Sequence, residues 1–151
     1  MSETEPVILT NMCMVCDGTR VLVQDRVDPE WPGIVFPGGH VKTGEPFARA
    51  VVREVEEETG LTVSDLRLCG VKQWTHPKGL HRYVVLLYRA DRFAGTLRDS
   101  DEGRVFWVER EALESCRLAE GFFEMLPVFE REDLTEMFFR YENGKWVYDL
   151  L

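Results

Sequence analysis

The chain has 151 residues, of which 44% are hydrophobic and 30% are charged, and its formal net charge at pH 7 is −9. These values predict one soluble domain with an adequate core, and no segment approaches the roughly 18 apolar residues of a membrane span. The negative charge argues against binding to the backbone of a long nucleic acid. It does not argue against binding of a small-molecule nucleotide, because bound cations change the sign of the local charge. The acidic N-terminus does not resemble a secretory signal, so we expect a cytoplasmic protein.

Two strands joined by a tight turn are predicted at the start of the chain. Residues 7–16 form an apolar run typical of a buried strand, and residues 21–26 form a second one. Asp17 and Gly18 between them favour a hairpin. Residues 27–33, rich in proline and acidic side chains, predict a loop that leads to a short apolar strand at residues 34–36.

The four cysteines do not form a recognised metal or redox motif. Cys13 and Cys16 have the C-x-x-C spacing, but no second pair accompanies them, and Cys69 and Cys116 stand alone. A zinc ribbon needs four ligands at compatible spacing. We therefore expect reduced thiols that pack as small apolar side chains.

A helix is predicted for residues 46–59, with proline in its first turn and a glycine directly after its end. At about 100° per residue, one arc of this helix is apolar and is expected to pack against the core. Its members are Phe47, Ala48, Val51, Val52 and Val55.

Three carboxylates of this helix cluster at the border of the apolar arc. Glu54, Glu57 and Glu58 have i, i+3, i+4 spacing, whereas Glu56 points toward solvent. Like charges at this spacing destabilise an isolated helix by roughly a few tenths of a kcal/mol each, and a neighbouring packed face adds a desolvation cost. Divalent cations would offset both costs, and hard oxygen ligands suit Mg²⁺, Mn²⁺ or Ca²⁺. The alternative is a solvated acidic helix face.

Residues 39–61 fit one spaced pattern throughout, G-x5-E-x7-R-E-U-x-E-E-x-G-U, where U is an aliphatic residue. This run resembles the Nudix box, and the chain length and lack of further domains resemble the MutT type of this family. The resemblance implies a hydrolase that uses Mg²⁺ or Mn²⁺ to cut a diphosphate bond in a nucleoside diphosphate linked to another group. It also implies one α/β domain over residues 1–151, an α/β/α sandwich around a mixed β-sheet.

The family pattern, carried onto this chain, implies that Glu54, Glu57 and Glu58 are metal ligands, together with the backbone carbonyl of Gly38. Glu57 or Glu54 is the first choice for the general base. A further acid commonly comes from a loop beyond the box, and Glu102 is the favoured one in the acidic loop at residues 99–103, where solvated turn residues are an equal alternative.

Arg53 and Glu45 are expected to brace the loop against the helix, although an ordinary surface ion pair worth at most about 1 kcal/mol is the alternative. Gly38 and Gly39 would let the backbone approach a bound ion or phosphate, because glycine has no Cβ.

The rest of the chain predicts further elements of one domain. They are strands at residues 61–73, 82–89 and 105–108, helices at 109–115 and 121–130, and a C-terminal hairpin at 137–150 around Asn143-Gly144.

Substrate contacts are less well defined by the sequence. Arg26 could contact a phosphate, and aromatic side chains could stack on a base, although most aromatics in a small domain belong to the core. His76 and His81 could form part of a substrate rim, while the histidines, including His40, are too irregularly spaced for a metal site. The candidate aromatic residues are Trp31, Phe36, Trp74, Tyr83 and Trp107.

The expected substrate is a nucleoside triphosphate, normal or oxidised, such as 8-oxo-dGTP, which would be hydrolysed to monophosphate and diphosphate. ADP-ribose or another nucleoside diphosphate derivative is the alternative, because Pro77 follows Leu61 by sixteen residues and resembles the ADP-ribose branch. A Nudix-like module that binds nucleotides without catalysis is a second alternative, but such modules typically lack box acids that are present here. The aromatic C-terminal hairpin could form a homodimer interface as easily as it could pack in the core.

Overall fold

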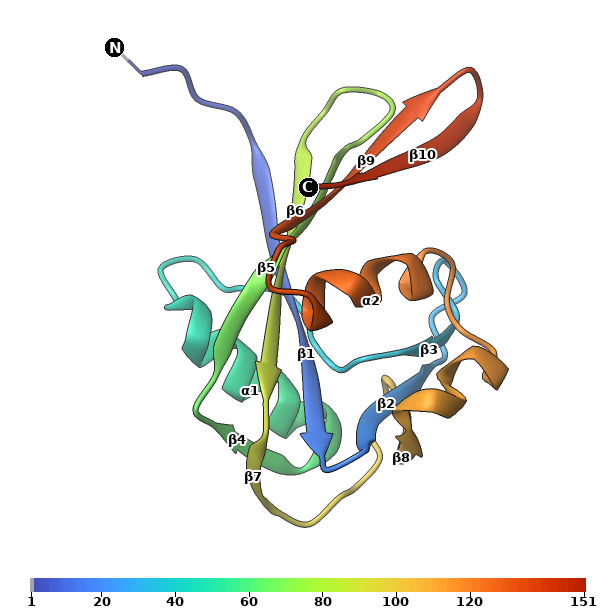
Figure 1. Cartoon of the computed structure of the whole chain (residues 1–151). Helices are drawn as coiled ribbons and strands as arrows, with labels where there is room; N and C mark the ends of the chain where they lie inside the picture. Colours follow the sequence, from blue (N-terminus) through green and yellow to red (C-terminus); the bar gives the residue numbers. More distant parts are fainter. Residues whose placement is uncertain (1) are drawn as a thin grey trace.

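The computed structural model describes residues 2–151 and contains one mixed β-sheet with helices on both faces (Figure 1). In chain order the elements are β1 (Val7–Asp17), β2 (Arg20–Arg26), β3 (Gly33–Val35), α1 (Phe47–Thr59), β4 (Leu61–Ser64), β5 (Arg67–Thr75), β6 (Arg82–Ala90), β7 (Arg92–Gly95), β8 (Gly103–Glu109), the 3₁₀ helix η1 (Arg110–Ser115), α2 (Phe122–Glu130), β9 (Glu136–Glu142) and β10 (Lys145–Leu150). The expected α/β/α sandwich is confirmed.

The main sheet has the order β10-β9-β5-β6-β1-β2-β3, and β8 pairs with β2 along its whole length, from Arg20 to Arg26. The β1–β6 and β5–β9 pairs are parallel and the remaining pairs are antiparallel. β4 and β7 form a separate two-stranded sheet. No helix among residues 2–151 is long and apolar enough to span a membrane.

The strands β1 and β2 diverge soon after their shared turn. Their register contains only two pairs, Cys16 with Val21 and Asp17 with Arg20. Beyond them the chain that follows β3 crosses over and pairs with β1, where the N–H of Cys13 donates to the carbonyl of Pro37 at 2.8 Å. The loop before α1 therefore lies between the two diverging halves of the sheet.

Alternate residues of β1 enter two separate cores, because successive side chains of a strand point to opposite faces. Met12 and Met14 pack with α2, whereas Cys13 and Val15 pack with α1. Cys16 joins the α2 side. The two cysteines of the C-x-x-C motif therefore point to opposite faces of the sheet, which supports the prediction that they do not bind one metal ion together.

The buried face of α1 differs from the predicted apolar arc. Phe47 is 42% exposed and Ala48 is also exposed, while Ala50 is fully buried. Glu58 lies on the buried face with Val51, Val55 and Thr59. Hydrophobic periodicity could not detect this arrangement, because a carboxylate with a backbone hydrogen-bond partner occupies a position that the pattern assigns to an apolar side chain.

The single strand predicted for residues 61–73 is wrong. The structure has two strands there, β4 and β5, because Asp65 adopts a left-handed backbone conformation with φ of 53° and turns the chain. β4 then pairs with β7, a strand that the sequence did not predict. The segment at residues 110–115 is a 3₁₀ helix, and residues 122–130 form the expected second helix.

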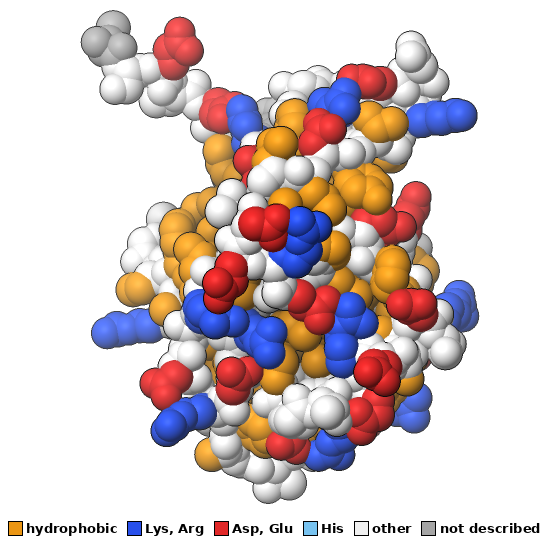
Figure 2. Space-filling model, in the orientation of Figure 1, with side chains coloured by type: hydrophobic (Ala, Val, Ile, Leu, Met, Phe, Trp, Pro, Cys, Tyr) orange, Lys and Arg blue, Asp and Glu red, His pale blue; other side chains and the backbone are white. Residues whose placement is uncertain are grey.

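The C-terminal hairpin is confirmed and projects beyond the body of the protein beside the β5–β6 turn (Figure 1). Asn143 and Gly144 both have positive φ, 51° and 77°, as a two-residue hairpin turn requires. Over the face drawn in Figure 2, acidic and basic side chains are interspersed, and hydrophobic side chains are visible near the base of the hairpin.

We expect the four thiols to differ in reactivity toward a thiol reagent such as DTNB. Burial raises the pKa of the thiols of Cys13, Cys16 and Cys69, but only Cys13 and Cys16 are fully buried, whereas Cys69 and Cys116 are half-buried and can be reached by the reagent. Because the thiolate is the reactive form, native protein should titrate two cysteines quickly. The variant C69S/C116S should titrate none until it is unfolded. Rapid modification of this variant in its native state would contradict the packing of β1.

Candidate active site

Two glycines bring the loop before α1 into close contact with both β1 and the helix. The N–H of Gly38 donates to Glu58 Oε2 at 3.0 Å, and the N–H of Gly39 donates to Asn11 Oδ1 at 3.2 Å. A Cβ on Gly38 would lie 2.1 Å from the carbonyl oxygen of Asn11. A Cβ on Gly39 would lie 2.4 Å from the Glu54 carboxylate. A side chain at Gly38 is therefore excluded by the backbone of β1, whereas one at Gly39 would displace the Glu54 carboxylate.

Arg53 connects the loop to the acidic face of α1. Its guanidinium holds Glu45 through two hydrogen bonds of 2.8 and 2.9 Å. It also donates to Glu54 at 2.9 Å, to Glu57 at 3.3 Å and to the carbonyl of His40 at 3.0 Å. The hydrogen bonds from Arg53 lower the pKa of Glu45 to about 2. This geometry is more than an isolated surface ion pair and agrees with the expected bracing of loop and helix.

Glu58 is the buried member of the acidic group, with 4% of its surface exposed. Burial, together with the charges of the neighbouring acids Glu54 and Glu102, raises the pKa of its carboxyl to about 8. The hydrogen bond from the Gly38 N–H and the charge of Arg26 act in the opposite direction without compensating for burial. The structure therefore places a carboxyl group where additional positive charge would favour its ionised form.

Two residues from outside the helix lie close enough to act on Glu58 electrostatically, namely Arg26 at the end of β2 and Glu102 in the turn before β8. The two turns are joined where the Val27 N–H donates to the Glu102 carbonyl at 3.3 Å. The acidic loop is thus folded toward the box helix, as the expected role of Glu102 as a further metal ligand requires. Glu56 is exposed, as predicted.

The donor set fits a hard divalent cation. It consists of carboxylates and the Gly38 carbonyl, which accepts none of the hydrogen bonds found among residues 2–151. Within those residues no three carboxylates, imidazoles or thiols already converge at ligand distance, because Glu54 and Glu57 contact Arg53 instead. Cation binding would therefore exchange some of these ion pairs for metal contacts.

Two buried amides near the loop escaped prediction from the sequence. Asn11 and Gln24 are 3% and 1% exposed, and their Nδ2 and Nε2 atoms have no hydrogen-bond partner among residues 2–151. The oxygen of Asn11 holds the Gly39 N–H, so this side chain positions the loop. The only sign of this role in the sequence is an asparagine inside a mostly apolar strand. No motif marks such an asparagine as a residue that positions a loop.

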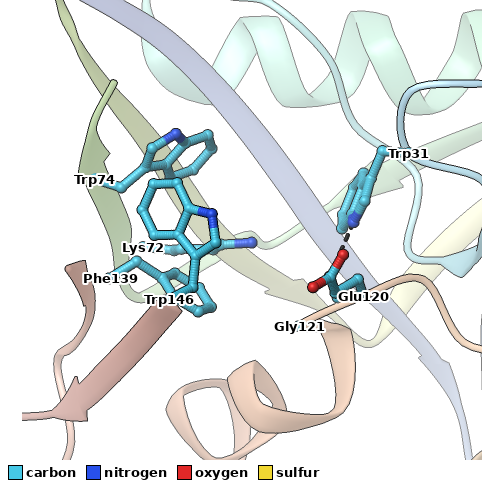
Figure 3. Close-up of a pocket in the computed structure, with 7 residues that line it drawn as sticks. All are labelled: Trp31, Lys72, Trp74, Glu120, Gly121, Phe139 and Trp146. Atoms are coloured by element: carbon cyan, nitrogen blue, oxygen red, sulfur yellow. Dashed lines mark hydrogen bonds between the residues drawn. The ribbon is translucent and has the colours of Figure 1, made fainter. Parts of the chain in front are cut away.

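An aromatic pocket opens on the α2 side of the sheet (Figure 3). It contains the predicted candidates Trp31 and Trp74, and Tyr83 stacks behind Trp74 with ring centroids 4.9 Å apart. The lining residues that the sequence did not single out are Lys72, Glu120, Gly121, Phe139 and Trp146.

The other predicted aromatic and histidine contacts, at Phe36, Trp107, His76 and His81, do not line this pocket. The expected substrate contact of Phe36 is wrong, because this residue is 1% exposed and packs edge-on against Phe122 and Phe129 in the core. Trp107 packs against Phe93 instead of lining the pocket. His76 and His81 lie beside each other at the β5–β6 turn, with ring centroids 5.6 Å apart.

Arg26 links the aromatic pocket to the acidic group. Its Nε donates to the Trp31 carbonyl at 3.1 Å, and its guanidinium lies 5.3 Å from the centre of the Trp31 ring. The same guanidinium attracts the Glu58 carboxylate. The guanidinium of Arg26 therefore lies between the pocket and the carboxylates, and the phosphate contact expected for this residue stays a prediction.

Comparison with known proteins identifies the family of the box segment and of most of the chain around it. A family model described as the NUDIX domain matches residues 8–131. The NAD-capped RNA hydrolase NudC of Mycobacterium tuberculosis is 42% identical over 71 residues, covering 46% of this chain and 22% of that protein. This chain therefore spans less than a quarter of the length of that relative. An ADP-ribose pyrophosphatase of Methanocaldococcus jannaschii is 27% identical over 143 residues, covering 92% of this chain and 76% of that protein.

Solved structures show the same fold. The mMutator MutT protein from Bacillus halodurans superposes with a TM-score of 0.79 at 25% identity, covering 95% of this chain and 97% of that one. The MutT NUDIX hydrolase from Burkholderia pseudomallei superposes with a TM-score of 0.70 at 26% identity, covering 81% and 97%.

Alanine substitutions at the two glycines should have different effects. Gly38→Ala forces a Cβ against the backbone of β1, which cannot move aside, so we expect a loss of stability of about 1–3 kcal/mol or more. Gly39→Ala meets only the movable end of Glu54, so we expect a near-normal melting temperature and turnover at least about tenfold lower. Calorimetry and steady-state hydrolysis test both. Equal destabilisation by the two substitutions would contradict the assigned contacts.

Proposed function

Because the chain belongs to the Nudix family, we propose that this Nudix hydrolase cleaves nucleoside triphosphates, normal or oxidised, to the monophosphate and diphosphate. The observation that carries the proposal is the intact acidic face of α1 beside an aromatic pocket, with Arg26 between them. The pocket walls suit a nucleobase, and the acidic face suits a cation-bound polyphosphate. We take 8-oxo-dGTP as the first oxidised substrate to test.

In the proposed hydrolysis, different residues bind the cations and accept the proton from water. Glu54, Glu57 and Glu58 would hold Mg²⁺ or Mn²⁺ together with the Gly38 carbonyl, and Glu102 would add a further ligand. The bound cations would neutralise the diphosphate and lower the pKa of the attacking water. Glu57 or Glu54 accepts the proton as the water oxygen attacks phosphorus and the bond to the bridging oxygen breaks.

The contacts around the site hold these groups in position before the cations bind. Arg53 fixes Glu54 and Glu57 relative to the loop, since it also holds Glu45. Gly39 leaves a surface without a Cβ, which gives the phosphates access to the backbone. Arg26 is proposed to hold a phosphate oxygen, because a guanidinium binds phosphate through several N–H donors at once.

Hydrolysis of ADP-ribose is the second candidate function. It is favoured by the similarity to the ADP-ribose pyrophosphatase of Methanocaldococcus jannaschii, which extends over 92% of this chain. Pro77 lies in the β5–β6 turn, where a proline is also an ordinary turn residue. A non-catalytic nucleotide-binding module is disfavoured, because the box acids and Arg53 are all present.

A substrate panel with Mg²⁺ and with Mn²⁺ separates these candidates. It should contain the normal nucleoside triphosphates, 8-oxo-dGTP, ADP-ribose and a dinucleoside polyphosphate. Release of diphosphate from a triphosphate supports the main proposal, and release of AMP from ADP-ribose supports the second. Inactivity on the whole panel, with nucleotide binding retained, would establish the binding module instead.

Replacing the site carboxylates should abolish turnover without unfolding the protein. Glu54→Gln and Glu57→Gln each remove a charge from the cation site and from the candidate bases, so we expect turnover to fall at least about a hundredfold. Glu56→Gln is the matched control, because the side chain of Glu56 is exposed on the same helix. Steady-state rates of the three variants measure the loss of turnover, and circular dichroism shows whether each variant remains folded. Near-normal turnover of Glu54→Gln or Glu57→Gln would exclude an essential role for that residue.

A further inference from the structure

Lys72 is a buried cation that the proposed hydrolysis does not use. It lies in β5, only 8% of its surface is exposed, and it forms part of the wall of the aromatic pocket. Its Nζ is 5.2 Å from the ring centres of Trp31 and Trp74 and 5.0 Å from that of Phe139. Among residues 2–151 this ammonium donates no hydrogen bond to an oxygen and forms no salt bridge with a carboxylate.

This position is electrostatically costly. A lysine has three N–H donors and no acceptor, and a buried ammonium is normally paired with a carboxylate. The aromatic faces offset part of the cost through cation–π attraction. Burial nevertheless lowers the pKa of Lys72 to about 8, and Glu124 opposes this shift only in part. The ammonium therefore retains unused hydrogen-bonding capacity directed at the pocket.

The walls of the pocket are held in place before any ligand enters. The indole N–H of Trp31 donates to the Glu120 carbonyl at 2.9 Å, and Arg26 covers its ring. Trp74 is stacked on Tyr83 with an angle of 11° between the rings. Figure 3 shows the Lys72 ammonium reaching from β5 into the space between Trp31 on one side and Trp74 with Trp146 on the other. A flat ring entering this space would lie against indole surfaces with its edge toward Lys72.

We propose that Lys72 makes this pocket selective for 6-oxopurine rings, such as guanine, 8-oxoguanine and hypoxanthine, over adenine. The inference rests on the proposed function, because the ring is that of the nucleotide whose phosphates reach the box helix. Guanine presents two adjacent acceptors, O6 and N7, and lysine contacts this pair in nucleic-acid complexes. Adenine presents an N6 amino donor beside N7, so it opposes a side chain that only donates.

The same argument disfavours a positively charged ring. An ammonium held within the pocket repels a cationic nicotinamide group, and the low-dielectric surroundings strengthen that repulsion. 8-Oxoguanine keeps the O6 acceptor, although its N7 carries a hydrogen and no longer accepts, so an oxidised guanine nucleotide contacts Lys72 through O6 alone. Lys72 thus selects the ring, whereas the carboxylates of α1 serve the cleavage of the diphosphate.

Direct binding tests the assignment without relying on catalysis. Dissociation constants of GMP, IMP and AMP are measured by isothermal titration calorimetry at pH 7 in EDTA, so that hydrolysis does not contribute. We expect GMP and IMP to bind roughly tenfold to a hundredfold more tightly than AMP. IMP lacks the 2-amino group, so similar affinities for GMP and IMP exclude that group as the source of the preference and leave the O6 side of the ring, which the Lys72 variants then test.

Three variants assign the preference to Lys72. Lys72→Met should bind GMP and AMP with similar affinity and should not melt below the wild type, because a buried charge is replaced by an apolar side chain of similar length. Lys72→Arg should retain part of the preference, since it keeps the donors. Lys78→Met, at an exposed lysine in the β5–β6 turn, should behave as the wild type.

Two results would overturn the inference. One is equal binding of GMP and AMP by the wild type, and the other is an unchanged preference in Lys72→Met. Failure of the proposed function is recognised separately, as inactivity on the substrate panel with the guanine preference intact.

Discussion

The hydrogen bond between the Gly38 N–H and Glu58 sets the relation between the box helix and the sheet. On one side Gly38 lies so close to β1 that a Cβ would meet the Asn11 carbonyl at 2.1 Å. On the other side its N–H is held by a carboxylate from the last turn of α1. Because α1 packs on one face of the sheet and the loop crosses between its diverging halves, this contact fixes the helix, the loop and β1 relative to one another. The positions of Glu54 and Glu57 follow from it.

The acidic groups on this helix and in the loop before it are stabilised in unequal ways. Glu45, Glu54 and Glu57 contact one guanidinium, that of Arg53, at a partly exposed position. Glu58 has no such partner, is buried, and has a pKa raised to about 8 by that burial. One end of the acidic group is therefore already neutralised by the protein, while the other end needs positive charge from elsewhere. This asymmetry favours a cation at the Gly38–Glu58 end of the group.

The sequence was sufficient to predict the box helix and its neighbours because their relations are local. Arg53 and Glu45 are eight residues apart, and the helix spacing alone places Glu54, Glu57 and Glu58 on adjoining positions. The burial of Phe36 was not predictable in the same way, because it depends on α2, more than eighty residues later in the chain. The break at Asp65 also escaped prediction, since a non-glycine residue there adopts positive φ.

The aromatic pocket was beyond sequence reasoning because it is assembled from distant strands. The parallel pairing of β5 with β9 places Phe139 next to Trp74, and the pairing of β6 with β5 places Tyr83 on the other side. Neither contact leaves a spacing that can be recognised in the sequence. Under the proposed function, the local box would determine the bond that is cut, and the non-local pocket would determine the ring that is accepted. Substitutions at Lys72 or Phe139 can therefore alter the choice of substrate while the contacts of Arg53, Gly38 and Glu58 stay unchanged.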